Sequence, residues 1–268
     1  MNYVAGIDMG SRMTKAVILD ERRQVLGKGS VRTRPDFPQV AQEALEAALA
    51  DAELRRDEIT YTATTGFGRF NIPFRDIQIT DMTCGARGAT FLFPGTVCVL
   101  DIGCQSTRAV RVRDGGRVKE FKTNDKCAAG AGGFIERAAR YLEVRLEAIG
   151  DLSLQADNPQ SISSVCAVLA ESEIINHMTA GVSVPNILRG IHLSLANRAL
   201  ALLKRVGLAP ELTFIGGVAR QAGMIRALEE TVGIKVNVPT EPELVGALGA
   251  ALLGLLRAEK LGLVSLAA

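Results

Sequence analysis

The fold is decided by a short sequence that occurs twice, first as Asp8-Met9-Gly10-Ser11-Arg12-Met13-Thr14-Lys15-Ala16-Val17 and then as Asp101-Ile102-Gly103-Cys104-Gln105-Ser106-Thr107-Arg108-Ala109-Val110. Five of the ten positions are identical, and Lys15 aligns with another cation, Arg108. Around both copies, apolar and β-branched runs separated by polar turns predict a meander of three strands. A segment that recurs together with its secondary structure indicates two homologous half-domains.

Each copy of the repeat is suited to binding a phosphate group. A buried strand ends in an Asp, and the following Gly lets backbone N–H groups approach a phosphate closely. The Asp can hold Mg²⁺ through water or orient a nucleophile. A single Asp-x-Gly is usually only a turn, whereas two copies at corresponding places are far more specific. We therefore predict two phosphate loops, in which the following residues contact nucleotide or Mg²⁺: Asp8, Gly10, Ser11, Thr14, Lys15, Asp101, Gly103, Cys104 and Thr107.

Two further features favour a nucleotide site. The run from Phe214 to Arg220 ends a strand and opens a helix, so Gly216, Gly217 and Val218 can place bare backbone against a flat ring or a phosphate. An ordinary strand–helix turn has the same pattern. Gln105 follows the second phosphate Gly, and its amide can orient an attacking water because it both donates and accepts. The predicted catalytic residues are thus Asp8, Asp101 and Gln105, although Gln105 could equally be a loop residue that points to solvent.

Composition excludes several classes of protein. Lys and Arg total 31 against 29 for Asp and Glu, so a net charge of +2 gives no indication of nucleic-acid or anionic-membrane binding. The N-terminus lacks the basic and apolar regions of a signal peptide, and the apolar stretch 244–256 is too short to span a bilayer. The odd cysteine count of five argues against a disulfide framework. Cys84 and Cys98 lie in apolar segments and are expected to be packing residues. We expect a cytoplasmic protein.

Hydrophobic periodicity predicts alternating strands and helices. The strands are expected at 4–8, 15–20, 25–32, 59–65, 77–79, 97–102, 107–112, 118–122 and 212–215. The helices are expected at 40–54, 80–91, 128–142, 166–180, 185–206, 217–232 and 242–258. The sequence Asp114-Gly115-Gly116 predicts the turn within the second meander.

Two phosphate loops followed by a Gly-Gly before a late helix resemble the actin, sugar kinase and heat-shock chaperone superfamily. Within it, the chain resembles the BadF/BadG/BcrA/BcrD-type ATPases, which activate 2-hydroxyacyl-CoA dehydratases or form ATPase subunits of benzoyl-CoA reductase. The resemblance implies an α/β, actin-like (ribonuclease H-like) fold of duplicated βββαβα half-domains. One domain would comprise 1–95 plus 242–268, and the other 96–241. The motifs that carry the resemblance span 124–132, 163–173, 187–192 and 246–251.

The resemblance also implies a cofactor and partners. Cys127 and Cys166, both at predicted helix N-termini where the dipole favours a thiolate, would be ligands of a 4Fe–4S cluster. Two thiolates per chain cannot fill four positions, so a homodimer or a heterodimer with a related subunit would share the cluster. ATP or ADP with Mg²⁺ would bind the loops, with Gly130, Gly132 and Glu136 near the ribose. A ferredoxin or flavodoxin would donate electrons, and an acyl-CoA dehydratase or reductase would accept them.

The chain departs from the family pattern at three positions. Cys104 stands where the family usually has Gly, Ser106 where it often has Asp, and Gly85 where it often has His. Cys104 could alter the geometry of the second loop, and the missing Asp could alter metal binding or the hydrolysis rate. A small-molecule kinase of the same superfamily remains an alternative, as does a non-enzymatic nucleotide-dependent scaffold, and neither needs a cluster. His177 and His192 lack a paired ligand in the sequence, and we expect both to be structural.

Overall fold

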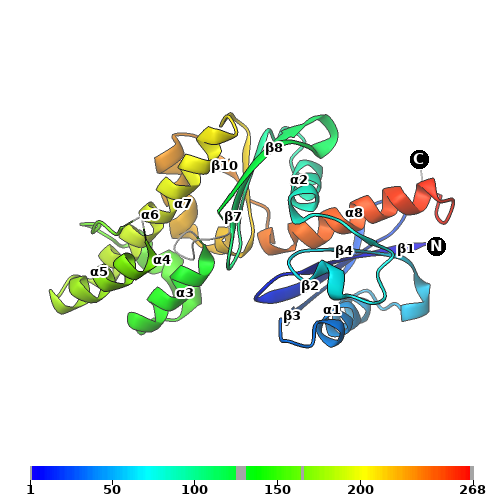
Figure 1. The fold of residues 1–268 in the computed structure, drawn as a ribbon, viewed down its shortest axis with the longest axis horizontal. Helices are drawn as coiled ribbons and strands as arrows, with labels where there is room; N and C mark the ends of the chain where they lie inside the picture. The colour runs from blue at the N-terminus through cyan, green and yellow to red at the C-terminus, as the bar shows by residue number, and fades with distance from the viewer. Residues whose placement is uncertain (1, 125–130, 164–165, 266–268) are drawn as a thin grey trace. The chain divides into compact units, whose positions relative to one another are not determined.

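The computed structural model describes residues 2–124, 131–163 and 166–265. The chain divides into two compact units, one made of Met1–Pro94, Arg113–Val118 and Leu244–Ala268 and the other of Gly95–Val112 and Lys119–Glu243. Within the described residues, each unit contains a five-stranded sheet with helices packed on it (Figure 1).

The first unit is built on a sheet of order β3-β2-β1-β4-β5, in which β1 is antiparallel to β2 and parallel to β4. Its strands are β1 (Tyr3–Met9), β2 (Met13–Leu19), β3 (Val25–Arg32), β4 (Ile59–Thr65) and β5 (Ile77–Gln78). Its helices are α1 (Phe37–Asp51), α2 (Asp81–Leu92) and α8 (Val245–Lys260), with short 3₁₀ turns at Arg56–Glu58, Arg69–Asn71 and Asp114–Gly116.

The second unit repeats this arrangement with order β10-β9-β6-β7-β8, in which β6 is antiparallel to β7 and parallel to β9. Its strands are β6 (Cys98–Ile102), β7 (Thr107–Arg113), β8 (Arg117–Asn124), β9 (Leu212–Ile215) and β10 (Val236–Asn237). Its helices are α3 (Gly132–Tyr141), α4 (Ile149–Leu154), α5 (Ala167–Thr179), α6 (Val184–Arg205) and α7 (Ala222–Val232). Turns of 3₁₀ type lie at Leu146–Ala148, Gly217–Arg220 and Pro242–Leu244.

The matching strand orders confirm the predicted α/β fold with duplicated half-domains. The two copies of the repeated sequence occupy corresponding places, since each forms the first hairpin of its sheet. The periodicity missed α4 and β10, which are too short to show a clear period. It also placed the start of α3 at residue 128, whereas the helix begins at Gly132 after an extended Ala131.

Alternating side chains give the first sheet two apolar faces. Ala5, Ile7 and Met9 of β1 pack with α1, whereas Val4 packs with the end of α8. Gly6 also faces α8, and a Cβ there would clash with backbone atoms of α8. Figure 1 shows α1 and α8 on opposite sides of these strands. The close approach of α8 therefore depends on a bare backbone in β1.

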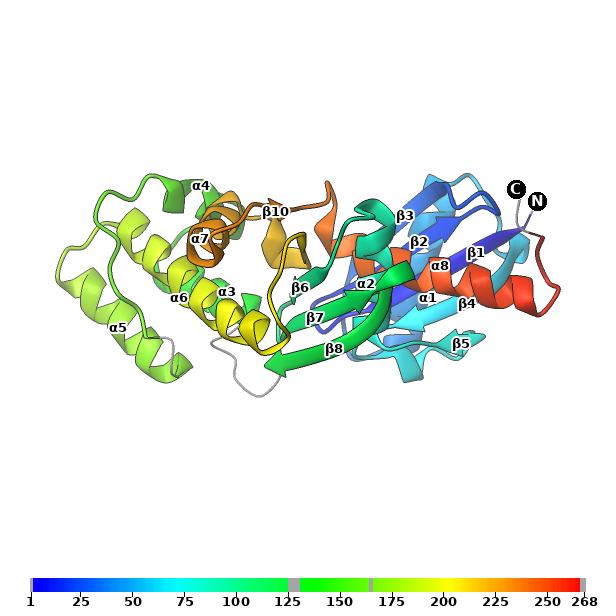
Figure 2. The same ribbon diagram turned by 90° about the horizontal axis from the view of Figure 1, so that it is seen from above.

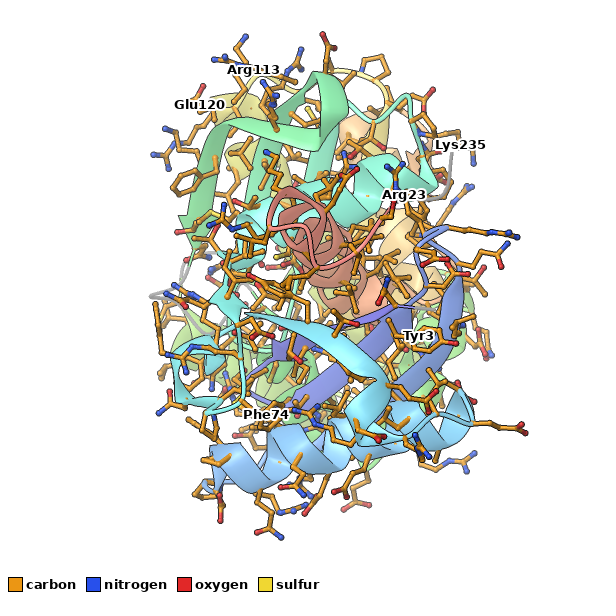
Figure 3. All side chains as sticks on the ribbon, turned by 90° about the vertical axis from the view of Figure 1, so that its right-hand side faces the viewer. Tyr3, Arg23, Phe74, Arg113, Glu120 and Lys235 are labelled. Carbon is orange, nitrogen blue, oxygen red and sulfur yellow. The ribbon has the colours of Figure 1, made fainter. Side chains whose placement is uncertain are left out.

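The turn between β2 and β3 is fixed by local hydrogen bonds. Asp20 Oδ1 accepts from the backbone N–H groups of Arg22 and Gln24, at 2.9 and 2.7 Å. Arg23, labelled in Figure 3, takes a φ of 64° between them. The polar turn predicted by the sequence is thus closed by an Asp side chain.

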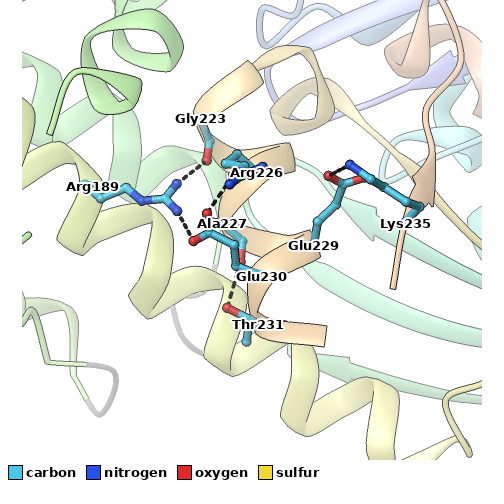
Figure 4. A network of polar contacts seen from close by, with 8 residues as sticks. All are labelled: Arg189, Gly223, Arg226, Ala227, Glu229, Glu230, Thr231 and Lys235. Carbon is cyan, nitrogen blue, oxygen red and sulfur yellow. Dashed lines mark hydrogen bonds and ion pairs between the residues drawn. The ribbon is translucent and has the colours of Figure 1, made fainter. Parts of the chain in front are cut away.

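In the second unit, α6 and α7 are joined by a polar network (Figure 4). The buried Arg189 of α6 donates to the carbonyl of Gly223 at 3.2 Å and forms an ion pair with Glu230. Arg226 Nε donates to the other Glu230 oxygen at 2.6 Å. A buried guanidinium is costly unless its donors are satisfied, so this network fixes how α7 docks on α6. In Figure 2, α5 lies beside α6, on the side away from α7.

Candidate nucleotide site and cysteine environment

The first predicted phosphate loop connects β1 to β2. Asp8 at the end of β1 pairs in register with Lys15 of β2, and Lys15 Nζ donates to Asp8 Oδ2 at 2.9 Å. The loop closes through the N–H of Gly10, which donates to the Met13 carbonyl at 3.2 Å. Thr14 is fully buried, and its hydroxyl lies 2.9 Å from that of Thr33. Thr14 therefore supports the loop from beneath, while Asp8 and Lys15 lie at its partly open side.

Two glycines approach the Asp8 carboxylate closely. A Cβ at Gly66, which has a φ of +87°, would clash with Asp8 Oδ1, and one at Gly246 would lie 3.1 Å from Oδ2. Gly66 follows β4 and Gly246 lies in the first turn of α8. Both oxygens of Asp8 thus border bare backbone, and a side chain at either glycine would crowd the carboxylate.

The second loop repeats the geometry of the first. Asp101 of β6 pairs in register with Arg108 of β7, and Arg108 Nη1 lies 3.3 Å from Asp101 Oδ2. The N–H of Gly103 donates to the Ser106 carbonyl at 2.9 Å, as Gly10 does to Met13 in the first loop. Thr107 is buried like Thr14. Ser11 and Gln105, the remaining predicted loop contacts, are half-buried and exposed respectively.

The structural repeat also includes a glycine beside each of the two Asp residues. Along the chain, these glycines lie far from the repeated sequence. Gly216 has a φ of +89°, and a Cβ there would lie 2.5 Å from Asp101 Oδ1, so Gly216 is the counterpart of Gly66. The residue before each glycine pairs in parallel register with the Asp: Thr65 with Asp8, and Ile215 with Asp101. Gly216 was predicted from the sequence, whereas the equivalent role of Gly66 was not. A Gly directly after the β-branched strand 59–65 is the pattern that could have indicated it.

The start of α3 lies against the second loop. The N–H groups of Gly132 and Gly133 donate to the carbonyls of Gly103 and Cys104, at 2.9 and 2.7 Å. Cys104 Sγ lies 4.0 Å from Glu136 Oε1. A Cβ on Gly132 would also lie 2.8 Å from the Val218 side chain. The second unit therefore brings together predicted contacts from three separate segments: Gly103, Cys104, Gly132, Glu136, Gly216, Gly217 and Val218. Gly130 lies outside the described residues.

Of the two predicted cluster ligands, only Cys166 lies within the described residues. Cys166 is half-buried and is the N-cap of α5, with its carbonyl accepting from Ala170 N at 3.0 Å. Cys127 lies outside the described residues. Cys84 and Cys98 are fully buried, and desolvation raises the pKa of Cys84 to about 12. Cys84 is thus a packing residue, as predicted, because a metal ligand must be a thiolate.

The described residues do not by themselves supply the donor set of a 4Fe–4S cluster. Across residues 2–124, 131–163 and 166–265, no group of three or more His, Cys, Asp and Glu side chains gathers as a metal site. A cluster needs four ligands. Cys166, at an accessible helix N-terminus, has the chemistry of one of them, so a cluster fits this chain only if Cys127 and a second chain supply the rest.

The two histidines contact protein atoms. His192 is 0% exposed, with Nδ1 lying 2.8 Å from Ser153 Oγ and Nε2 lying 2.9 Å from Gln221 Oε1. Burial lowers the pKa of His192 to about 4. His177 Nε2 lies 3.2 Å from the Ser161 carbonyl. These contacts give both histidines a structural role.

The comparisons with known proteins agree on one family. The sequence profile of the BadF/BadG/BcrA/BcrD ATPase family matches residues 5–254. An activator of lactoyl-CoA dehydratase from Anaerotignum propionicum is 43% identical over 96% of this chain and 99% of its own length. One of the subunits of benzoyl-CoA reductase from Thauera aromatica is 41% identical over 97% of this chain and 96% of its own length.

The fold agrees with a solved structure from the same group. The activator of the 2-hydroxyisocaproyl-CoA dehydratase from Clostridium difficile, solved with bound ADPNP, superposes with a TM-score of 0.92 at 36% identity. The match covers 99% of each chain. In the part of the chain that the structure describes, no helix is both long and apolar enough to cross a membrane.

Proposed function

Because the chain belongs to the BadF/BadG/BcrA/BcrD ATPase family, we propose that it hydrolyses ATP to drive low-potential electrons into an acyl-CoA dehydratase or reductase. One observation carries the proposal furthest. The unit that contains the second Asp–Gly loop also holds Cys166 at the N-terminus of a long helix, α5. Neither a small-molecule kinase nor a scaffold needs that cysteine.

Each loop offers backbone N–H groups and one cation to a phosphate. Lys15 and Arg108 would contact phosphate oxygens, each released from its present Asp partner. Asp8 and Asp101 would then hold Mg²⁺ through water, and Gln105 would orient the attacking water. Gly216 and Gly217 would lie against the base, and Glu136 would contact the ribose. These roles combine polar side chains with glycine backbone that no Cβ covers.

The cysteines would hold the redox group. Cys127 and Cys166 from each of two chains, identical or related, would bind one 4Fe–4S cluster, which supplies one-electron transfer at low potential. Cys166 is suited to this role because it is half-buried and is the N-cap of α5, and the N-terminal end of a helix favours an anionic group. A ferredoxin or flavodoxin is the expected donor, and an acyl-CoA dehydratase or reductase the expected acceptor.

Iron analysis of anaerobically purified protein tests the proposal. We expect a brown protein with about four irons per two chains. Cys127→Ser and Cys166→Ser should each lose the iron and still bind ADP. Cys98→Ser is the matched control, because this cysteine is fully buried and should leave the iron content unchanged. Colourless protein that phosphorylates a sugar or an acid would support the kinase alternative, and colourless protein that only binds nucleotide would support the scaffold.

A further inference from the structure

Helix α3 touches the second phosphate loop at one end and α5 further along. Its first two residues, Gly132 and Gly133, donate their N–H groups to the loop carbonyls of Gly103 and Cys104. These contacts are backbone hydrogen bonds of 2.9 and 2.7 Å, so the loop and the start of α3 cannot shift independently without breaking them. A phosphate bound at this loop would therefore act on the position of α3.

Side chains of α3 hold α5 through one carboxylate. Arg137 Nε donates to Glu171 Oε1 at 2.6 Å, and the Tyr141 hydroxyl donates to Glu171 Oε2 at 3.3 Å. Arg137 and Tyr141 are one helical turn apart, so they present both donors on the same face of α3. The side chains of Arg137 and Glu171 are 35% and 22% exposed, which makes this a partly shielded ion pair. Both oxygens of Glu171 are thus engaged by the helix that leads from the loop.

Helix α5 begins directly after its N-cap Cys166 and has few apolar anchors of its own. Ala170 and Ile174 are its buried residues, whereas Val168 and Leu169 are 69% and 53% exposed. The backbone of Cys166 is continuous with the helix, since its carbonyl accepts from Ala170 N. A helix with so little buried surface is displaced at low cost, so a polar contact to a neighbour can influence where it lies.

We propose that Arg137, Tyr141 and Glu171 are positioning residues that transmit occupancy of the second phosphate loop to the Cys166 end of α5. This inference rests on the proposed function, because it assumes that the loop binds nucleotide. The path runs from the loop carbonyls through α3 to Glu171, and then back along α5 to Cys166. A purely structural pair at the surface would have a small effect on stability and none on how nucleotide alters Cys166.

The test measures the reactivity of Cys166 in the full-length protein, freed of iron and kept reduced. The alkylation rate of Cys166 by iodoacetamide is followed by peptide mass spectrometry, with and without Mg²⁺ and a non-hydrolysable ATP analogue. We expect the nucleotide to change this rate by about fivefold or more in the wild type, the lower end of the range typical of coupling between sites. In Glu171→Gln and Arg137→Met the ratio of the two rates should fall towards one.

Three further variants separate coupling from general damage. The charge-swapped double variant Arg137→Glu/Glu171→Arg restores an ion pair and should recover most of the nucleotide effect. Tyr141→Phe removes one hydroxyl and should give an intermediate ratio. Glu43→Gln is the matched control, because it breaks the Arg34–Glu43 ion pair of 2.6 Å in the other unit and should leave the ratio at the wild-type value. Thermal melts show which variants remain folded.

Two results would overturn the inference. One is an unchanged ratio in folded Glu171→Gln, and the other is a wild type that binds nucleotide without any change at Cys166. Isothermal titration of the analogue distinguishes these from failure of the proposed function, in which the wild type binds no nucleotide. The alkylation test uses protein without iron. Its result therefore stays valid even if iron analysis shows that the protein binds no cluster.

Discussion

Lys15 Nζ lies 2.9 Å from Asp8 Oδ2, and the two side chains are 13% and 16% exposed. The charges therefore neutralise each other across the first hairpin, in a position where water screens them only partly. Arg108 and Asp101 stand in the same register in the second hairpin, at 3.3 Å. If a nucleotide with Mg²⁺ binds here as proposed, phosphate would replace the Asp as partner of the cation, and the metal would replace the cation as partner of the Asp.

Replacing Lys15 should weaken nucleotide binding strongly. Lys15→Met keeps the aliphatic stem and removes the charge, so the loss is that of a charge-assisted hydrogen bond, about 1.5–3 kcal/mol or roughly 10- to 100-fold in the Kd of ADP. Isothermal titration measures this Kd. Lys28→Met, at an exposed position on the neighbouring strand β3, is the control and should bind normally. Equal affinities of Lys15→Met and wild type for ADP would show that Lys15 does not contact the nucleotide.

Gly216 and Gly217 should respond differently to alanine. At Gly216 a Cβ meets Asp101 and the φ is +89°, so Gly216→Ala should lower the free energy of unfolding by about 2 kcal/mol or more. At Gly217 a Cβ meets nothing within 4 Å, so Gly217→Ala should melt like the wild type. If the base lies on this backbone, Gly217→Ala should nevertheless bind ADP about tenfold more weakly, by loss of close contact. Normal ADP binding by Gly217→Ala would show that the base does not contact this backbone.

Bound nucleotide should protect Cys104 from alkylation. This thiol is half-buried in the second loop, beside Glu136. A phosphate on the loop would cover it, so ADP with Mg²⁺ should slow its reaction with N-ethylmaleimide by about tenfold at saturating ligand. Peptide mass spectrometry reports each cysteine separately. Cys84 is the internal control and should stay unmodified throughout, because it is fully buried and its pKa is raised to about 12.

The stability of the second unit should depend on pH through His192. Burial lowers its pKa from 6.5 to about 4, so the unfolded chain takes up the proton more readily than the folded one. The stability contributed by the neutral ring is therefore complete above pH 6.5 and is lost as the pH falls towards 4, by up to roughly 3 kcal/mol. Thermal melts between pH 4 and pH 8 measure this loss. His192→Gln should show a shallower decline, and parallel curves for the two proteins would exclude His192 as the cause.

The repeated Asp-x-Gly sequence was sufficient to predict the duplicated fold. Strand alternation, glycine turns and strand-end carboxylates are local properties, and they placed Asp8, Gly10, Asp101 and Gly103 at the ends of the first strand of each sheet. The family resemblance likewise rests on contiguous motifs, and the comparisons confirmed it. Short elements such as α4 and β10 could not be predicted from the sequence. They are too short to show a hydrophobic period, and tertiary packing stabilises them.

The tertiary structure alone decided which distant residues meet. The sequence determined that an Asp ends each of two strands and that Cys166 precedes a helix. It did not determine that Gly66 and Gly216 stand at the same place beside those Asp residues, because this follows from parallel pairing of β1 with β4 and of β6 with β9. Nor did it indicate that Arg137 reaches Glu171. Such contacts depend on how helices dock, which is fixed by the packing of whole apolar faces and leaves no local pattern in the chain.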